Sequence, residues 1–550
     1  MTKALLVTHT RIGVCPARSW FGGFCVLTLL VLLCLVSTKA FCQAPAPAQT
    51  PAAGSPVSDL LDVLLANGTI TQQQYDALKQ RYAAKHEAQM AIHAEQAAQP
   101  APQPVIMPAN VVTAMDNAIG FHVGRFDLTF SGEINGFYVH DRPDRNPKNN
   151  DGGCVLCLAN NANQNNSSIR NGLLPGDLTI KLATKEDGYD VAFTFGLWPG
   201  ISNLMTSGAG GLNLNVGNPS GFGTAGIDFR QQYLTVGKPH MGTFKFGRDL
   251  GFFGQEAILN DMSLLGVGTT NGNVGPGSVS LGRIGTGYIY TDWIPQISYT
   301  SPSYHGLQVA GGIFTPMDDV VSTTLDAPAY SAPLTGNGQP QFQFKATYAA
   351  PTIAGIKSKF WTNYFTQSME AGTSDYANSA CTASHIIPST PTTIPVTVCT
   401  AHALAIRPGD SVQANAVDYG TKLSYRGFDF VGYGYNGWGI GTEGLLFLAT
   451  SPSGSTRPSQ GYYLQGLYTV AKKWTFGASF GQSNLSFADK GEDLDSLAIA
   501  RYNGSYIGQL RYALTKSVYL LGEYTHTRAE SQARLISTED SFALGSIAFF

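Results

Sequence analysis

The chain has 550 residues, of which only 13% are charged, and its formal net charge at pH 7 is −3. Soluble domains carry about 25% charged residues and nucleic-acid-binding domains are usually basic, so this composition argues against both classes. Glycine is abundant, with 62 residues, and aromatic residues make up 11%. A transmembrane β-barrel suits this composition, because only alternate residues of its strands must be apolar.

The N-terminal segment has the pattern of an export signal. Basic residues precede an apolar run over 24–36, which is too short to span a bilayer and is typical of a signal-peptide core. Small residues follow, and we expect cleavage after Ala44, so that 1–44 is a signal peptide. The alternative is a retained membrane anchor. Removing four basic residues and no acid takes the formal charge from −3 to −7.

A short helical region is predicted next. An Ala/Pro-rich linker over 45–58 precedes two predicted helices within 59–98, and the second opens with a capping box, Thr71 to Gln74. These helices can form a hairpin, a trimeric coiled coil or a floppy arm. A Pro-containing linker over 99–120 follows.

From residue 121 to 550, strand patterns alternate with tight and long gaps. Tight gaps follow the even-numbered strands and long gaps the odd-numbered ones, which predicts short periplasmic turns and long extracellular loops. An even strand count returns both ends of the barrel to the periplasm. The prediction is an all-β, 16-stranded antiparallel transmembrane barrel, with strands at 126–140, 177–184, 189–198, 227–237, 241–249, 295–302, 306–315, 340–350, 355–368, 411–426, 428–438, 459–470, 473–484, 502–514, 517–528 and 541–550.

Alternation within the strands separates lipid-facing from lumen-facing residues. In the first strand Phe126, Phe130 and Tyr138 share one face, whereas Asp127 and Glu133 lie on the other. The same rule turns further polar residues inward: Asp177, Thr179, Lys181, Gln343, Lys345, Thr347, Lys422, Arg426, Gln509, Arg511 and Glu523. Side chains cannot fill the interior of sixteen strands, so the barrel is expected to enclose an aqueous channel.

Several segments carry a family resemblance. The chain ends at Phe550 in an alternating strand that resembles the C-terminal strand of bacterial outer-membrane barrels. The pair Gly247-Arg248, the long gap 250–294 and the segment Tyr299-Thr-Ser-Pro-Ser-Tyr-His-Gly306 resemble the trimeric general-diffusion porins of Gram-negative bacteria. Arg230-Gln-Gln-Tyr-Leu-Thr-Val-Gly237 also looks like the family's fourth strand.

The resemblance implies an outer-membrane channel that passes small hydrophilic solutes and ions without a cofactor. It also implies a homotrimer in contact with outer-membrane lipid and lipopolysaccharide, and a third loop that folds into the lumen. In the family, acids of that loop face basic residues of the wall. This places Arg248 and Lys181 on the wall and Glu256, Asp261 and Arg283 on the loop, as candidate constriction residues.

Arg248 poses a physical problem for this assignment. Strict alternation places it on the lipid face with Phe244 and Phe246, where arginine costs about 2–4 kcal/mol near the midplane. We therefore expect a bulge or early strand end that turns it inward. The chain also departs from the family at Thr300 and Glu133, where relatives carry basic residues.

Four cysteines remain after the signal, in two predicted extracellular loops. Exported loops favour disulfides, so we expect a Cys381–Cys399 bridge and pairing of Cys154 with Cys157. The alternative is a zinc site, because Cys381 and Cys399 each have a histidine within four residues.

Two other functions stay open. A selective phosphate or dicarboxylate channel would show a basic ladder along one wall. The other is an outer-membrane enzyme or adhesin. A barrel enzyme would need a group of catalytic residues at the rim of the barrel, for which His526, Glu523 and Ser531 are the candidates.

Overall fold

The computed structural model describes residues 62–68, 71–81, 84, 112–144, 165–201, 227–270, 279–318, 334–372, 408–451, 453–489 and 499–550. They belong to two compact units, Met1–Ile106 and Met107–Phe550. The predicted signal peptide, the linker 45–58 and the four loop cysteines lie outside the described residues. The cleavage site, the linker and the pairing of the cysteines therefore stay predictions.

The first unit contains helical segments at 62–66 and 72–81. The predicted capping box is present: the Gln74 amide donates to Thr71 Oγ1 at 3.3 Å, and the Thr71 amide donates to Gln74 Oε1 at 2.9 Å. Tyr75 is buried, and its hydroxyl donates to Asp62 Oδ1 at 2.5 Å, which joins the two segments. No helix in the described part of the chain is long and apolar enough to cross a membrane.

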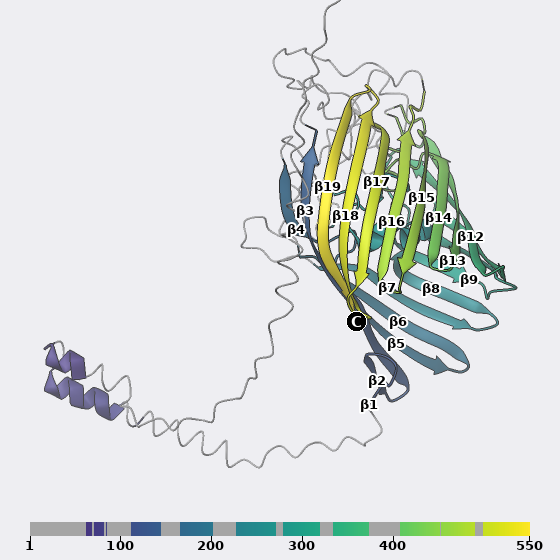
Figure 1. Ribbon diagram of the computed structural model, residues 1–550. Helices are drawn as coiled ribbons and strands as arrows, with labels where there is room; N and C mark the ends of the chain where they lie inside the picture. The colour runs from purple at the N-terminus through teal and green to yellow at the C-terminus, as the bar shows by residue number, and fades with distance from the viewer. Residues whose placement is uncertain are drawn as a thin grey trace, which may run out of the picture. The chain divides into compact units, whose positions relative to one another are not determined.

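The second unit is the predicted 16-stranded antiparallel barrel, closed by pairing of its last strand with its first (Figure 1). The sixteen strands are β3 (Phe126–Pro143), β5 (Asp177–Glu186), β6 (Tyr189–Pro199), β7 (Ile227–Lys238), β8 (Gly242–Leu250), β9 (Trp293–Thr300), β10 (Leu307–Phe314), β11 (Gln341–Ile353), β12 (Ile356–Glu370), β13 (Ser411–Tyr425), β14 (Phe428–Trp438), β15 (Pro458–Val470), β16 (Trp474–Leu485), β17 (Ala500–Ala513), β18 (Val518–Ser531) and β19 (Ile536–Phe549). Three short strands are added. β2 (Gly120–Val123) and β4 (Asn166–Arg170) pair with β3, and β1 (Val112–Ala114) pairs with β2.

The alternation of exposure along the strands agrees with the predicted faces. On β3, Ile134 and Tyr138 are exposed, whereas the intervening Asn135 and Phe137 are buried. Phe137 faces inward although it is apolar, because it packs with Val267 of the loop that follows β8. An apolar inward residue therefore marks where the wall is covered by protein.

The structure differs from the prediction at the end of one strand and in the length of one loop. Arg426 is not a lumen residue, because β13 ends at Tyr425 and the tight turn to β14 consists of Arg426 and Gly427, both at positive φ (47° and 86°). Two-residue hairpin turns with two positive φ angles match the twist of the paired strands. The loop between β18 and β19 is also shorter than predicted, spanning only 532–535, because β18 and β19 pair as far as Glu530 and Ile536.

Candidate functional site

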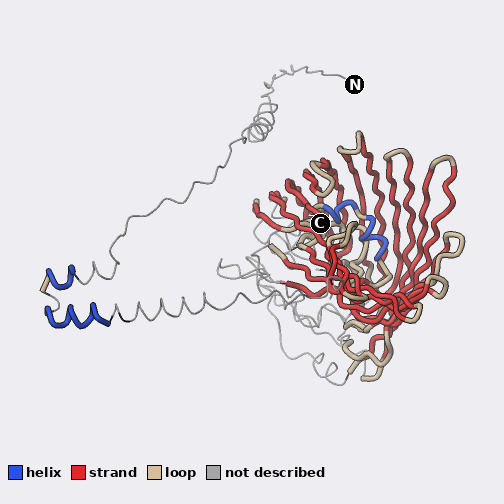
Figure 2. The backbone as a smooth tube through the Cα atoms, turned by 90° about the horizontal axis from the view of Figure 1, so that it is seen from below, coloured by secondary structure: helices blue, strands red, loops and turns tan. Residues whose placement is uncertain are grey.

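The loop between β8 and β9, residues 251–292, folds into the lumen, and we call it the inner loop. Its described residues form α4 (Gln255–Asn260) and the 3-10 helix η1 (Met262–Leu265). Figure 2 shows these helices inside the ring of strands. The turn before α4 is made by Gly254 at φ 77°, where a side chain would strain the backbone.

Inward side chains of the wall hold the first half of the inner loop. Gln343 Oε1 on β11 accepts from the Phe252 and Phe253 amides at 2.6 and 2.8 Å, and Asp418 Oδ2 on β13 accepts from the Gly254 amide at 2.7 Å. These acceptors satisfy amides that lie before and at the start of α4, which otherwise lack partners.

The second half is held in the same way by strands farther round the barrel. On β15, Tyr463 donates to the Ala257 carbonyl at 2.9 Å, while Gln465 accepts from the Met262 amide at 2.7 Å and donates to the Asn260 carbonyl. On β18, Glu523 Oε1 accepts from the Val267 and Gly268 amides at 3.1 and 2.5 Å. Thr270 then donates to Glu539 on β19 and to Asp141 on β3. The inner loop therefore follows the wall from β11 to β18 and reaches β19 and β3 at Thr270.

Aromatic packing fills the space between the inner loop and this wall. Tyr288 of the loop lies 6.5 Å from Tyr433 and 6.0 Å from Tyr463, measured between ring centroids, and Phe253 lies 5.8 Å from Phe365. All five rings are buried. We call β11–β18 the covered wall.

Glu256 projects from α4 toward two lysines of the covered wall. Its carboxylate lies 2.6 Å from Lys345 Nζ on β11 and 2.7 Å from Lys359 Nζ on β12. Burial opposes its negative charge, but the two ammonium groups outweigh burial and hold the pKa of the Glu256 carboxyl below its ordinary value. Glu256 is therefore ionised and paired at neutral pH.

Like Glu256, the other two loop candidates are buried and do not face the open lumen. Asp261 is buried and caps η1, where it accepts from the Ser263 amide at 2.9 Å and from the Tyr288 hydroxyl at 3.0 Å. Arg283 is fully buried beneath the loop and donates to Ser505 on β17, to the carbonyl at 3.3 Å and to Oγ at 3.2 Å. Both residues hold the loop together or in place, which corrects their assignment to the constriction.

Arg248 also lies away from the lumen. β8 pairs without interruption with β7 and β9, so the expected inward bulge is absent and Arg248 faces outward in register with Gln232 and Pro295. Its side chain is exposed on the face that carries Phe244 and Phe246. The assignment of Arg248 to the constriction is therefore wrong for this fold, because alternation persists to the end of the strand.

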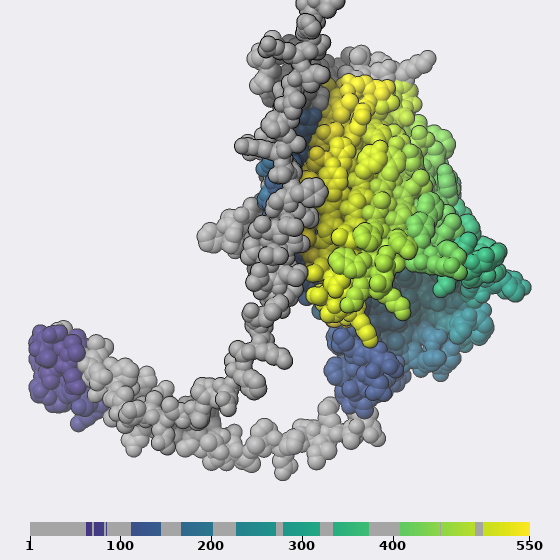
Figure 3. Space-filling view, viewed as in Figure 1, coloured from purple at the N-terminus to yellow at the C-terminus, as the bar shows by residue number. Residues whose placement is uncertain are grey.

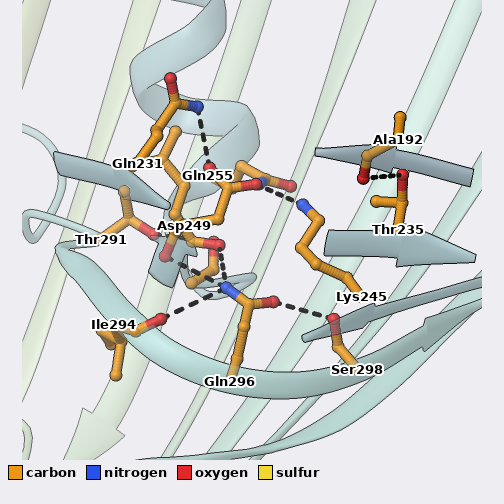
Figure 4. A network of polar contacts seen from close by, with 12 residues as sticks. Ala192, Gln231, Thr235, Lys245, Asp249, Gln255, Thr291, Ile294, Gln296 and Ser298 are labelled. Atoms are coloured by element: carbon orange, nitrogen blue, oxygen red, sulfur yellow. Dashed lines mark hydrogen bonds and ion pairs between the residues drawn. The ribbon is translucent and has the colours of Figure 1, made fainter. Parts of the chain in front are cut away.

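Lys181 is inward on β5, as predicted, and exposed. On β8, Lys245 pairs with Asp249, which also accepts from Gln231 Nε2 at 3.0 Å (Figure 4). Among the described residues, the inner loop forms no hydrogen bond with β5, β6 or β7. We call β5–β8 the bare wall.

Sequence reasoning missed part of this arrangement. Lys345 was placed inward by alternation, but Lys359 was not singled out, although it alternates with the outward Phe360 on the same strand. The pairing of either lysine with Glu256 carries no local signal, because the residues lie about 90 and 100 positions apart.

The structure does not bring the candidate catalytic residues His526 and Glu523 together. Glu523 faces inward to the inner loop, whereas His526 faces outward and lies 2.8 Å from Asp540. In the described part of the chain, no group of three His, Cys, Asp or Glu residues could hold a metal ion.

Comparison with known proteins gives a family and a fold. The family model for Gram-negative porin matches residues 109–532. The structure of the outer membrane channel DcaP of Acinetobacter baumannii is similar at 12% identity and a TM-score of 0.50, covering 80% of this chain and 99% of that one. Pseudomonas putida OprB (10% identity, TM-score 0.44, 77% and 94% covered) and Salmonella typhi OmpF in complex with daunomycin (11%, 0.43, 78% and 98%) are also similar.

A search of curated proteins finds no match. The family match extends over more than three quarters of the sequence, and it covers the inner loop and all but the last of the barrel strands. The chain belongs to the Gram-negative porin family.

Proposed function

We propose that solutes cross this outer-membrane diffusion channel between the inner loop and the bare wall. The observation that carries the proposal is the uneven attachment of the inner loop. Its described hydrogen bonds reach β3, β4, β11–β13 and β15–β19 but not β5, β6 or β7. Lys181 and the Lys245–Asp249 pair then line one side of the passage. Leu259, which is 52% exposed on α4, lines the other.

Sieving by such a passage depends on size first and on charge second. The loop side presents the apolar Leu259 and the half-buried amides of Gln255 and Asn260, whereas the wall side presents the exposed Lys181 and an ion pair. Charges on one side of a narrow aqueous passage create a transverse field that favours polar solutes and biases ion flow. The Glu256–Lys345–Lys359 group adds a net positive charge beneath α4.

Liposome swelling with uncharged sugars of increasing size tests this proposal. Passive diffusion predicts rates that fall steadily with solute size and that do not saturate with concentration. Replacing Leu259 with Trp narrows the proposed passage and should slow the larger sugars most. Replacing Val309, an exposed residue on the outer face of β10, with Trp is the matched control. Equal rates in the two variants would place the passage elsewhere.

A homotrimer is supported by the outer face of the early strands. Phe193, Phe195, Phe244 and Phe246 are exposed there, and the outward Arg248 interrupts this apolar surface. An arginine that faces lipid near the midplane costs about 2–4 kcal/mol, whereas a protein neighbour can supply hydrogen-bond acceptors. Unheated detergent extracts should run at three times the mass of the mature chain, and a monomer under mild detergent would contradict this.

We extend the proposal to three features outside the described barrel. Residues 1–44 are removed during export, the helical unit lies in the periplasm, and the outer leaflet's lipopolysaccharide contacts the barrel. N-terminal sequencing of protein from outer membranes should begin at Pro45. Protease added to intact cells should spare the helical segments 62–66 and 72–81.

A Cys381–Cys399 disulfide is part of the same proposal. The chain-entropy model gives a loop of about twenty residues a stabilisation of roughly 3 kcal/mol. Non-reducing peptide mapping should find the two cysteines linked. Free thiols, or one bound zinc per chain, would reject the bridge.

A further inference from the structure

Three arginines converge on one glutamate at the extracellular ends of β17 and β18. The Glu530 carboxylate lies 2.8 Å from Arg501 Nη1, 3.1 Å from Arg534 Nη1 and 3.3 Å from Arg528 Nη2. We call these four residues the arginine cluster. Arg528 also lies over the ring of Tyr502, 5.9 Å from its centroid.

The cluster has more positive charge than its carboxylate neutralises. Three guanidinium groups carry three positive charges and fifteen N–H donors in total, against one negative charge and two oxygens. The Glu530 side chain is 11% exposed, whereas those of Arg501, Arg528 and Arg534 are 36%, 46% and 64% exposed. The carboxylate thus lies beneath guanidinium groups whose remaining donors face solvent. Such a group suits a second anion with several oxygens, because guanidinium forms paired hydrogen bonds with phosphate.

The cluster lies on the outer face of the barrel, away from the lumen. Arg528 is paired with Gly504 and Thr538, and Glu530 with Tyr502, on the face that carries the exposed Tyr506. Figure 3 shows the outer surface of these strands in yellow and yellow-green. A ligand of this cluster therefore approaches from the membrane side and not through the channel.

The height of the cluster matches the lipid headgroups. Along the outer face of β18 the residues change in order from Leu520 through Tyr524 and His526 to Arg528 and Glu530. This order is apolar, then aromatic, then charged, as expected where a barrel leaves the hydrocarbon and enters the interface. Arg528 lies four residues past Tyr524, about 14 Å along the strand, which strand tilt reduces to roughly 10 Å in height.

We propose that the arginine cluster binds a phosphate group of the outer-leaflet glycolipid, with Arg528 and Arg534 as its main donors. This rests on the proposed outer-membrane orientation, in which the loop ends of β17 and β18 are extracellular. Glu530 orders the three guanidinium groups so that their free N–H donors remain available. The ligand chemistry is a phosphomonoester held at a lipid surface.

Binding of lipid A to the refolded full chain in detergent micelles tests this inference. The probes are lipid A with both phosphates, dephosphorylated lipid A, and inorganic phosphate as a competitor. The R528Q/R534Q double variant should bind phosphorylated lipid A at least tenfold more weakly than the wild type, and dephosphorylated lipid A should bind neither protein. R125Q is the matched control, because Arg125 pairs with Glu186 at the opposite rim.

Several outcomes would overturn the proposal. Equal binding by wild type and R528Q/R534Q would remove the cluster from the site. Competition by inorganic phosphate at micromolar concentration would assign the site to a free anion and not to a lipid headgroup. Acidic residues in 490–498 lie outside the described residues, and if they occupied the arginines, lipid A would not bind. The single variant R528Q repeats the test should the double variant fail to refold.

The proposed passage and the proposed lipid site are tested by different measurements, so either proposal can be rejected without the other. Conductance in planar bilayers depends on the inner loop and the bare wall, which the arginine variants leave intact. A variant that loses lipid A binding and keeps wild-type conductance supports the assignment. If the wild-type protein showed no conductance in planar bilayers, the proposed passage would be wrong, and the measured binding of lipid A would still stand.

Discussion

The covered wall and the bare wall of the lumen differ in what their inward side chains bind. On the covered wall Gln343, Asp418 and Glu523 accept hydrogen bonds from backbone amides of the inner loop. On the bare wall Lys181 is exposed, and Lys245 and Asp249 pair with one another. A polar inward residue can therefore either hold a loop or meet a solute, and its neighbours decide which.

The strongest test of the covered wall is removal of Glu523. Replacing it with Ala leaves the Val267 and Gly268 amides without their acceptor and also removes one of two acceptors of Gln509 Nε2, 2.6 Å away. A buried donor without a partner costs about 1–3 kcal/mol, so we expect the free energy of unfolding to fall by roughly 2–4 kcal/mol. Guanidinium unfolding measures the fall, and single-channel current should become noisier as the loop moves.

Glu523→Gln is the matched control for that test. It keeps one acceptor oxygen and the shape of the side chain, so it should lose less stability than Glu523→Ala. Equal stability of Glu523→Ala and wild type would mean that the inner loop does not depend on β18.

A second test changes the charge beneath α4. Glu256→Gln removes the carboxylate that pairs with Lys345 and Lys359, so two lysines are left without it. We expect the reversal potential in a salt gradient to shift toward anions. The shift should shrink as salt rises toward about 1 M, where the Debye length is roughly 3 Å. An unchanged reversal potential at low salt would show that ions do not sense this group.

The bare wall should give a smaller effect of opposite sign. Lys181→Ala removes one exposed inward cation that has no ion pair among the described residues. Selectivity should shift toward cations, by less than Glu256→Gln shifts it toward anions, because one charge changes in the wider solvent of the passage. Lys185→Ala, at the tight turn between β5 and β6 and paired with Asp190, is the control that should leave the reversal potential unchanged.

The contact between the inner loop and the loop 439–457 should depend on pH. The Glu443 carbonyl accepts from the Tyr290 amide at 2.6 Å, and the Glu443 side chain lies against Gly285. Burial raises the pKa of the Glu443 carboxyl to about 8. Since the folded pKa exceeds the unfolded one, the stabilisation is complete below the ordinary glutamate range. It is lost as pH rises to about 8, by about 1.4 kcal/mol per pKa unit.

Glu443→Gln separates this contribution from other titrations. The wild type should lose more stability than the variant between pH 5 and pH 8.5, measured by guanidinium unfolding. Parallel pH profiles for the two proteins would show that the Glu443 carboxyl is solvated.

Strand positions and faces could be predicted from the sequence because alternation is local. Residues i and i+2 share a face in any strand, so Lys181 and Lys345 were placed inward correctly. The path of the inner loop is not local, since it depends on contacts such as Gln343 with Phe252, about 90 residues apart. Whether Asp261 and Arg283 face water or lie beneath the loop therefore had no signal in the sequence.

Arg248 gives the smallest expected effect and the sharpest contrast with the family pattern. Resemblance placed it in the constriction, whereas regular pairing with Gln232 and Pro295 places it on the outer face. Arg248→Ala should therefore leave the reversal potential unchanged at low salt, although Lys181→Ala shifts it. The same variant should weaken the trimer on unheated gels, because it removes the contact proposed between the outward arginine and the neighbouring chain. A shift toward cations in Arg248→Ala would instead mean that the Arg248 side chain reaches the lumen and lines the passage with Lys181.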